Sequence, residues 1–309
     1  MDKTHLLIDG RVALGAFDFD GNILRTPTKL YLINTSTGEE EDFEWHMLDQ
    51  HPEMISWVNP AYRIHEKSYN SFAHFRDFSE HPEHHGADQL LQDVEYAIQN
   101  KDFSPSFDSF KHTFLIKARL FAIITARGHS GENMARAMIH INNATLTQEE
   151  KDTQYKNICN LYSIFEGREA TFSKQEEAVW YYLNVVARYY PLSSTIASNW
   201  LDIPRTMPSS QKKTVAMKHF IEVTRRKIHT IGSISQKNIS VGFSDDSVGN
   251  IDAMLQFFLQ ERKELPKGII HTGDKVRLYY TWPQWKFPTN TELGIPMKQR
   301  AETLVIQIQ

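Results

Sequence analysis

The chain has 309 residues, of which 40% are hydrophobic and 23% are charged, and its formal net charge is −4. This length is typical of one large or two modest domains, and the composition is ordinary for a soluble globular protein. The balance of 34 basic against 38 acidic residues excludes the chain-wide positive charge typical of nucleic-acid-binding domains.

Cysteine usage and the N-terminal segment indicate the compartment. Cys159 is the one cysteine, so no disulfide can form within the chain. Residues 1–10 lack the cationic segment and long apolar core of a secretion signal. No apolar run reaches the ~18–20 residues that span a bilayer. The sequence therefore predicts a cytoplasmic protein with no membrane partner.

The first motif is the apolar run from Val12 to Phe17, which ends in Asp18 and Asp20 and is followed by Gly21. Such a run is typical of a buried strand in a parallel sheet. Ligands of open α/β sheets bind beyond the carboxyl ends of the strands. Side chains at i and i+2 share a face, so the two carboxylates can converge on a cation or a phosphoryl group. Taken alone, Asp-x-Asp-Gly is also common in turns and calcium loops.

The segment after this motif carries a hairpin pattern and two groups of ionisable residues. We expect Lys29–Asn34 to form one arm of a hairpin that turns near Gly38. Residues 37–53 contain seven acidic residues and no Lys or Arg, which favours a solvated acidic face. His81, His84 and His85 do not have the spacing of a tetrahedral zinc motif, so a loop is favoured there.

A second apolar strand, residues 120–124, is expected after a helix over 88–100 and another over 106–119. It ends in Thr125, Ala126 and Arg127, followed by Gly128. A hydroxyl and a guanidinium at a strand end suit hydrogen bonding to phosphoryl oxygens. Strand-to-turn junctions favour Thr and Gly in any case, so this motif alone is not specific.

Residues 130–220 look mainly helical, with interruptions. Ser130 is a candidate helix cap, and the segments that begin at Thr147 and Ser173 both have capping-box spacing. A strand between Val185 and Ser194 remains an alternative to helix, because that run is β-branched and aromatic. Residues 144–205 exceed the usual length of a sheet-to-helix connection, so an insertion is expected there.

A basic helix start and an acidic strand end follow. The helix begins at Pro208 and carries Lys212 and Lys213 in its first turn, where the helix dipole disfavours cations. This indicates a functional lysine, or alternatively a solvated basic helix. The strand over 239–244 runs into Asp245 and Asp246 and then into a helix that ends near Glu264.

Paired carboxylates at a strand end repel one another unless a cation or a proton lies between them. Two acidic strand ends together imply a hard divalent metal, most simply Mg²⁺.

In the tail, residues 275–282 and 303–308 are expected to be strands, paired with each other or added to a sheet edge. Trp282, Trp285 and Phe287 are candidates to pack over the first motif.

Four motifs, in this order, resemble those of the haloacid dehalogenase superfamily of phosphohydrolases. The motifs are Phe-Asp18-Phe-Asp20-Gly-Asn, Ile-Ile-Thr125-Ala-Arg, Lys213-Thr-Val-Ala-Met and Phe-Ser-Asp245-Asp246-Ser-Val-Gly-Asn250. They cover about half of the chain. The resemblance implies an α/β fold, a Rossmann-like three-layer sandwich with a central parallel sheet, plus largely helical insertions. The implied core comprises residues 1–28, 106–143 and 206–265; residues 29–105 and 144–205 are insertions, and 266–309 form a β-rich extension.

The resemblance also implies roles for individual residues. Asp18 would be the nucleophile that becomes a phosphoaspartate, and Asp20 the general acid and base. Thr125, Ala126 and Lys213 would bind phosphate, with Lys212 the alternative lysine. Asp18, Asp20 (through its backbone carbonyl) and Asp245 would bind Mg²⁺. Secondary roles would fall to Asp246, Arg127 and Asn250. The Asp-Asp-x-x-x-Asn form of the last motif differs from the commoner Gly-Asp form, and leaves the role of Asp246 open.

Several functions remain open at this stage. The first is a Mg²⁺-dependent phosphatase acting on a small phosphomonoester or nucleotide. The second is a phosphatase of nucleic-acid ends, which the hairpin, the basic helix and the aromatic tail favour and the acidic segment disfavours. The others are a catalytically idle binding module and phosphotransfer to another acceptor. The presence of Asp20 favours phosphatase over dehalogenase chemistry. The insertions carry no substrate motif, and the oligomeric state is not predicted.

Overall fold

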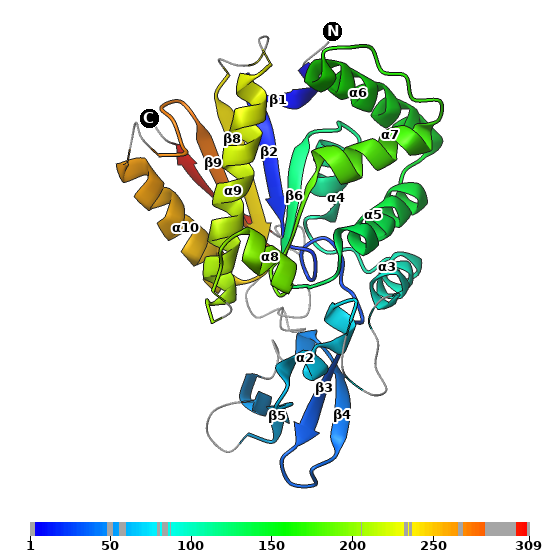
Figure 1. Ribbon diagram of the computed structural model, residues 1–309, viewed down its shortest axis with the longest axis vertical. Helices are drawn as coiled ribbons and strands as arrows, with labels where there is room; N and C mark the ends of the chain where they lie inside the picture. Colours follow the sequence, from blue (N-terminus) through cyan, green and yellow to red (C-terminus); the bar gives the residue numbers. More distant parts are fainter. Residues whose placement is uncertain are drawn as a thin grey trace, which may run out of the picture.

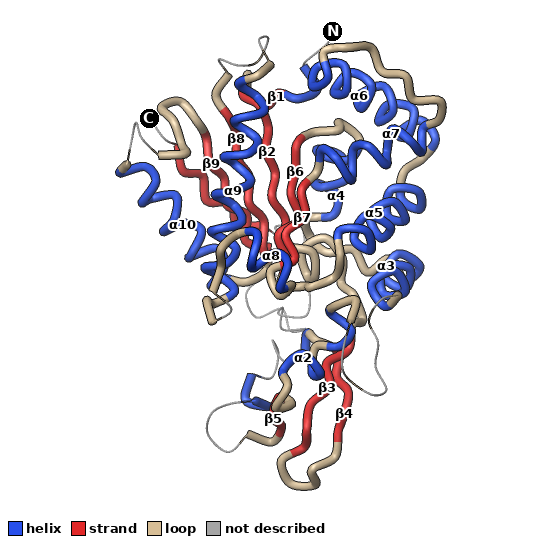
Figure 2. The backbone as a smooth tube through the Cα atoms, in the orientation of Figure 1, coloured by secondary structure: helices blue, strands red, loops and turns tan. Residues whose placement is uncertain are grey.

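The computed structural model describes residues 4–47, 52–55, 60–78, 81, 86, 88–204, 206–231, 234, 237–264, 268–281 and 301–307. His84, His85, Trp282, Trp285 and Phe287 lie outside these described residues, so the expectations for them are not addressed. The main body is a mostly parallel central sheet flanked by helices, compatible with a Rossmann-like fold (Figures 1 and 2). A smaller sheet lies apart from it, beyond the carboxyl ends of the central strands.

The central sheet has seven strands among the described residues, in the order β10-β9-β8-β2-β6-β7, with β1 paired to β2. Strands β9, β8, β2, β6 and β7 are parallel to their neighbours in this run, whereas β1 and β10 are antiparallel. The strands are β1 (Leu7–Ile8), β2 (Arg11–Phe17), β6 (Leu120–Thr125), β7 (Arg188–Pro191), β8 (Ile239–Asp245), β9 (Lys275–Thr281) and β10 (Ala301–Gln307).

The apolar runs of the sequence became central strands because both faces of the sheet are covered. All six residues of β6 are buried, as are six of the seven in β2 and in β8. The two C-terminal strands predicted to pair do so, and β9 also pairs with β8. Both alternatives considered for the tail are therefore realised together.

The strand order reverses at β2. From β2 the chain continues outward on one side through β6 and β7, then returns to the other side with β8 and β9. In open α/β sheets, the crevice at such a reversal is where ligands bind. The carboxyl ends of β2 and β8 flank this point.

Helices surround the sheet. Helix α9 crosses in front of it in Figure 1 and packs against α10, and these two helices also contact β6, β8 and β9. The helices of the main body are α3 (Gln89–Gln99), α4 (Phe107–Phe110), α5 (Gly131–Thr145), α6 (Gln148–Glu166), α7 (Gln175–Tyr181), α8 (Thr195–Trp200), α9 (Ser209–His229) and α10 (Val248–Lys263). One-turn elements are the 3₁₀ helix η1 (Thr4–Leu6) and the π-helices η4 (Lys111–Leu115) and η5 (Tyr182–Val186). In the described part of the chain, every helix is too short or too polar to cross a bilayer.

Of the three helix caps expected from the sequence, at Ser130, Thr147 and Ser173, the first two are present. Ser130 Oγ accepts a hydrogen bond from the backbone N–H of Asn133, and Thr147 forms the expected capping box with Glu150. The capping box predicted at Ser173 is wrong, because α7 begins at Gln175 after Lys174. Ser173 instead donates to the Glu177 carboxylate, through its backbone N–H (2.9 Å) and its hydroxyl (2.7 Å).

The segment 144–205, expected to be a mainly helical insertion, is not separate from the sheet. It contributes β7, which pairs in parallel with β6, so the strand alternative is correct for residues 188–191, whereas Val185 and Val186 end the π-helix η5. The sequence pattern was ambiguous because a β-branched and aromatic run of this length suits a buried helix as well as a strand.

The smaller sheet has the order β4-β3-β5, with strands β3 (Lys29–Asn34), β4 (Glu40–Glu44) and β5 (Tyr62–Ile64). The predicted hairpin between β3 and β4 is confirmed, and Gly38 in its turn has φ +76°. Short helical turns follow or interrupt this sheet: η2 (Pro52–Ile55), α2 (Ser68–Ser71) and η3 (Ala73–Phe75). Within segment 29–105, α3 belongs to the main body, where it packs against α5.

Candidate active site

The first and last motifs meet at the reversal of strand order. In the sheet register Phe17 is opposite Ser244, and the backbone N–H of Asp18 donates to the Ser244 carbonyl at 3.0 Å. Asp18 follows β2 directly, and Asp245 is the last residue of β8. The exposed fraction is 8% for Asp18 and 0% for Asp245. Parallel pairing therefore brings together two carboxylates that are 227 positions apart (245 − 18).

Lys213 lies between these two carboxylates. Its Nζ is 2.6 Å from Asp245 Oδ2 and 2.9 Å from Asp18 Oδ2, and its side chain is 2% exposed. Lys213 reaches the site because it lies early in α9, which packs over the sheet. Of the two candidate lysines, Lys213 is thus the one that the structure brings to Asp18, whereas Lys212 is half-buried.

Hydrogen bonds to Oδ1, the oxygen that does not face Lys213, fix the orientation of the Asp245 carboxylate. Asp245 Oδ1 accepts hydrogen bonds from Asn250 Nδ2 at 2.9 Å and from the backbone N–H of Ser247 at 3.0 Å. Asn250, predicted as a secondary site residue, therefore acts on Asp245. With one oxygen held in this way, the other is directed toward Lys213.

Three carboxylates form a group that could hold a metal ion. Asp18, Asp245 and Asp246 are all buried, and one oxygen of each lies within 4.8 Å of the others. A set of carboxylate oxygens suits a hard divalent cation such as Mg²⁺. Asp20, expected to contribute its backbone carbonyl, does not bring its carboxylate into this group.

Burial and neighbouring charges shift the pKa values of Asp18 and Lys213. Burial raises the pKa of Asp18 to about 7; Lys213 opposes this shift, and Asp245 and Asp20 add to it. Burial by itself would lower the pKa of Lys213, but the Asp18 and Asp245 carboxylates raise it above the usual value. The Lys213 ammonium thus contacts two buried carboxylates, and a bound cation would add positive charge beside them.

Thr125 brings the second motif to the same edge of the sheet. It is the last residue of β6, the neighbour of β2 on the side opposite β8. Thr125 is 1% exposed, and its Oγ1 accepts the backbone N–H of Arg127 at 3.2 Å. Ala126, which follows, is exposed. All four sequence motifs thus meet at the carboxyl ends of three adjacent strands.

The Asp20 carboxylate is engaged by Arg127. Arg127 Nε donates to Asp20 Oδ2 and Arg127 Nη2 to Asp20 Oδ1, both at 2.7 Å. The Thr26 hydroxyl donates to Asp20 Oδ1 at 2.6 Å. Arg127 was expected to bind phosphoryl oxygens, but in the structure its bidentate partner is Asp20.

The Arg127 guanidinium is the centre of a buried network. Arg127 is fully buried; its Nη2 donates to Thr28 Oγ1 at 2.5 Å and lies 4.0 Å from Asp93 Oδ2. The Thr28 hydroxyl donates to Asp93 Oδ2 at 2.5 Å. Burial raises the pKa of Asp93, and Arg127 opposes that shift. The network ties α3, and the connection that leads into β3 of the small sheet, to Asp20.

Sequence reasoning missed Thr26, Thr28 and Asp93. A signal for Asp93 was present, because it lies on the buried face of α3 with Leu90, Val94 and Ala97. An acid on an apolar helix face requires a buried cation as partner. No comparable signal marks the two threonines, whose contacts arise only in the fold.

Replacing Arg127 by methionine is expected to lower the free energy of unfolding by about 3–5 kcal/mol, because the Asp20 and Asp93 carboxylates would stay buried without their cation. Urea-induced unfolding measures this loss. Arg136→Met is the matched control, since Arg136 is exposed and its ion pair with Asp88 spans 3.7 Å; its cost is expected to be below about 1 kcal/mol. Equal costs for the two variants would contradict the network.

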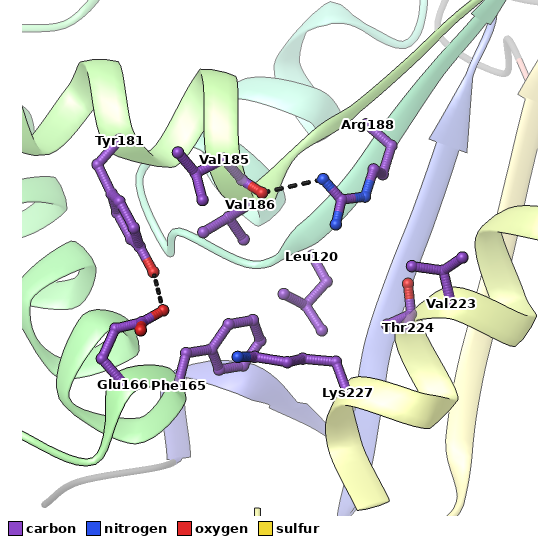
Figure 3. A pocket seen from close by; sticks show the side chains of 10 residues that line it. All are labelled: Leu120, Phe165, Glu166, Tyr181, Val185, Val186, Arg188, Val223, Thr224 and Lys227. Carbon is purple, nitrogen blue, oxygen red and sulfur yellow. Dashed lines mark hydrogen bonds between the residues drawn. The ribbon is translucent and has the colours of Figure 1, made fainter. Parts of the chain in front are cut away.

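A separate cavity of about 220 Å³ lies at the other end of β6 (Figure 3). It adjoins Leu120, the first residue of that strand, whereas Thr125 is the last. Strand geometry places these two residues about 16 Å apart. Its wall includes Phe165, over whose ring Lys227 Nζ lies at 5.4 Å, and Tyr181, which donates to Glu166 at 3.2 Å. This cavity is therefore separate from the aspartate group.

Comparisons with protein-family models, with curated proteins and with solved structures gave no match for this chain.

Proposed function

We propose that this protein is a Mg²⁺-dependent phosphatase of the haloacid dehalogenase type, which hydrolyses a small phosphomonoester through a phosphoaspartate on Asp18. The observation that carries the proposal is the position of Lys213 between Asp18 and Asp245, with Asp246 beside them, at the reversal of strand order. A nucleophilic carboxylate, a cation and a hard-metal donor set are what this chemistry requires.

In the first step, an Asp18 oxygen attacks phosphorus and the bond from phosphorus to the leaving oxygen breaks. The leaving oxygen takes a proton from Asp20. In the second step water attacks the phosphoaspartate, Asp20 accepts the proton of that water, and the Asp18 carboxylate is regenerated. Splitting the transfer in this way replaces one difficult displacement by two easier ones.

The surrounding residues would neutralise and position the phosphoryl group. The Lys213 ammonium offsets negative charge next to Asp18, and the Thr125 hydroxyl and Ala126 N–H are proposed to bind phosphoryl oxygens. Bound Mg²⁺, held by Asp18, Asp245, Asp246 and the backbone carbonyl of Asp20, would supply additional positive charge at the transferring group.

Asp20 is proposed to act after release from Arg127. The bidentate ion pair occupies both of its oxygens, so proton transfer requires its carboxylate to turn toward the leaving oxygen. Thr26 and Thr28, which lead into the small sheet, belong to the same network. Movement of this segment is therefore the proposed means by which substrate binding would free Asp20.

The acidic small sheet favours a compact substrate. Strand β4 has the sequence Glu-Glu-Asp-Phe-Glu and leads, through β3, to Thr28 beside the site. Such a strand would repel a long polyanion. A small phosphomonoester or nucleotide is therefore proposed in preference to a nucleic-acid end.

The test is phosphate release from a nucleotide monophosphate, a sugar phosphate and a 3′-phosphorylated oligonucleotide, with Mg²⁺ and with a chelator. Mg²⁺-dependent release from one of the two small substrates is expected. Preference for the oligonucleotide would overturn the substrate class. Absence of release from all three by folded, Mg²⁺-loaded protein would favour the binding-module alternative.

A further inference from the structure

A second group of metal-ligating side chains lies in the small sheet, away from the aspartates. Glu40 Oε2 is 2.6 Å from His65 Nε2 and 2.7 Å from His81 Nε2. One ligand atom of each of the three residues lies within 4.8 Å of the others. The side chain of His81 is 5% exposed, that of His65 19% and that of Glu40 26%. Two imidazoles, of which only that of His81 is buried, thus converge on one carboxylate oxygen.

The fold brings these residues together from three separate segments. Glu40 begins β4 and His65 follows β5, and these strands flank β3 on either side. In the register, Glu40 is opposite Ile33, which is opposite Arg63. Side chains alternate along a strand, so Glu40, Arg63 and His65 share one face of the sheet.

His81 covers this face from outside the strands. Its ring lies 5.7 Å from that of Tyr31, two residues before Ile33 on β3 and thus on the same face, and 5.7 Å from that of His65. The three ligand atoms are therefore held by a sheet on one side and by a later segment of the chain on the other.

We propose that Glu40, His65 and His81 form a binding site for one Zn²⁺ ion. Two imidazole nitrogens with one carboxylate oxygen are a common zinc donor set, with one position left for water or another ligand. Imidazole ligands disfavour Mg²⁺ and Ca²⁺, which take oxygen. The donor sets of the two groups in this protein are therefore chemically distinct.

The geometry is close to that of a loaded site. Ligand atoms at 2.0–2.1 Å from zinc in a tetrahedron lie about 3.3 Å from one another. The two short separations at Glu40 need to open by roughly 0.7 Å to admit the ion, which small side-chain rotations provide. The bound ion would cross-link positions separated by 25 and 41 residues in the chain. It would thereby fix the small sheet against the segment that contains His81.

The test is a titration of the full-length, chelator-treated protein with Zn²⁺ by calorimetry, in excess Mg²⁺ to occupy the aspartate group. One equivalent of Zn²⁺ per chain is expected in the wild type and in Asp18→Asn. That equivalent is expected to be lost in His65→Ala and in His81→Ala. His74→Ala is the matched control, since His74 contacts Tyr31 at 2.9 Å but is not part of the group, and it is expected to retain the ion.

A measurement on the wild type tests the proposal without relying on variants that fail to fold. X-ray absorption at the zinc edge of the one-to-one complex is expected to show two imidazole ligands among nitrogen and oxygen donors. Absence of stoichiometric binding, unchanged binding in His65→Ala and His81→Ala, or a zinc shell without two imidazoles would each overturn the proposal. None of these readouts depends on phosphatase activity, so the zinc site and the proposed function stand or fall separately.

Discussion

The Asp18→Asn variant is expected to release phosphate on the order of 10⁴–10⁶-fold more slowly than the wild type, the range seen when an essential nucleophile is removed. Asparagine keeps the shape of the side chain but cannot form the acyl phosphate. Steady-state phosphate release with saturating Mg²⁺ measures the effect. A rate within tenfold of the wild type would exclude Asp18 as the nucleophile.

Asp18→Asn is also expected to change how the free energy of unfolding depends on pH. Measuring this shows whether a loss of activity comes from lost chemistry or from lost folding. The pKa of Asp18 is raised to about 7 from an ordinary value of 3.8, so the native state binds the proton more tightly than the unfolded chain. The contribution of this group to stability is therefore present below about pH 4 and is lost as the pH rises toward 7. Without metal, the wild type is expected to lose stability over this interval, and Asp18→Asn is expected to lose less. Urea-induced unfolding at pH 5 and pH 8 in a chelator checks the sign.

Replacing Lys213 by methionine is expected to destabilise the metal-free protein and to slow turnover. The Asp18 and Asp245 carboxylates would stay buried without the ammonium that contacts both of them, at a cost of about 3–5 kcal/mol. Loss of a cation beside the transferring phosphoryl group is expected to slow turnover by on the order of 10²–10³-fold. Unfolding in chelator and kcat/KM with Mg²⁺ measure the two effects.

The neighbouring lysine provides the control for this prediction. Lys212→Met removes the same side chain one position away, and it is expected to change kcat/KM by less than about tenfold. Because the carboxylates are also metal ligands in the proposal, Mg²⁺ is expected to stabilise Lys213→Met more than the wild type. Equal effects of the two lysine variants, or no added stabilisation by Mg²⁺, would contradict the position assigned to Lys213.

The central sheet could be predicted because its strands are buried on both faces. The runs ending at Phe17, Ile124 and Ser244 are short, apolar and followed by polar residues, and each became a parallel strand. Their polar ends then met at one edge because parallel strands share a direction. The aspartates and Thr125 were therefore recognisable as candidate site residues before the fold was known, and Lys213 was recognisable from its place early in a helix and from the motif resemblance.

Contacts made only by tertiary packing could not be predicted in the same way. Nothing local in the sequence indicates that Arg127 pairs with Asp20, because Thr28 and Asp93 reach it from other segments. The group formed by Glu40, His65 and His81 could not be predicted either, because these residues follow no fixed spacing in the sequence. Strand β7 could not be told from a helix in the sequence, because its short aromatic run fits helix and strand equally well.

The most direct test of the central claim is reductive trapping of the acyl phosphate during turnover. Rapidly quenched, borohydride-treated enzyme is digested, and the peptide carrying Asp18 is analysed by mass spectrometry. The proposed chemistry requires that Asp18 be converted to homoserine only when substrate and Mg²⁺ are both present. Turnover with Asp18 unmodified and another residue trapped in its place would contradict the phosphoaspartate mechanism.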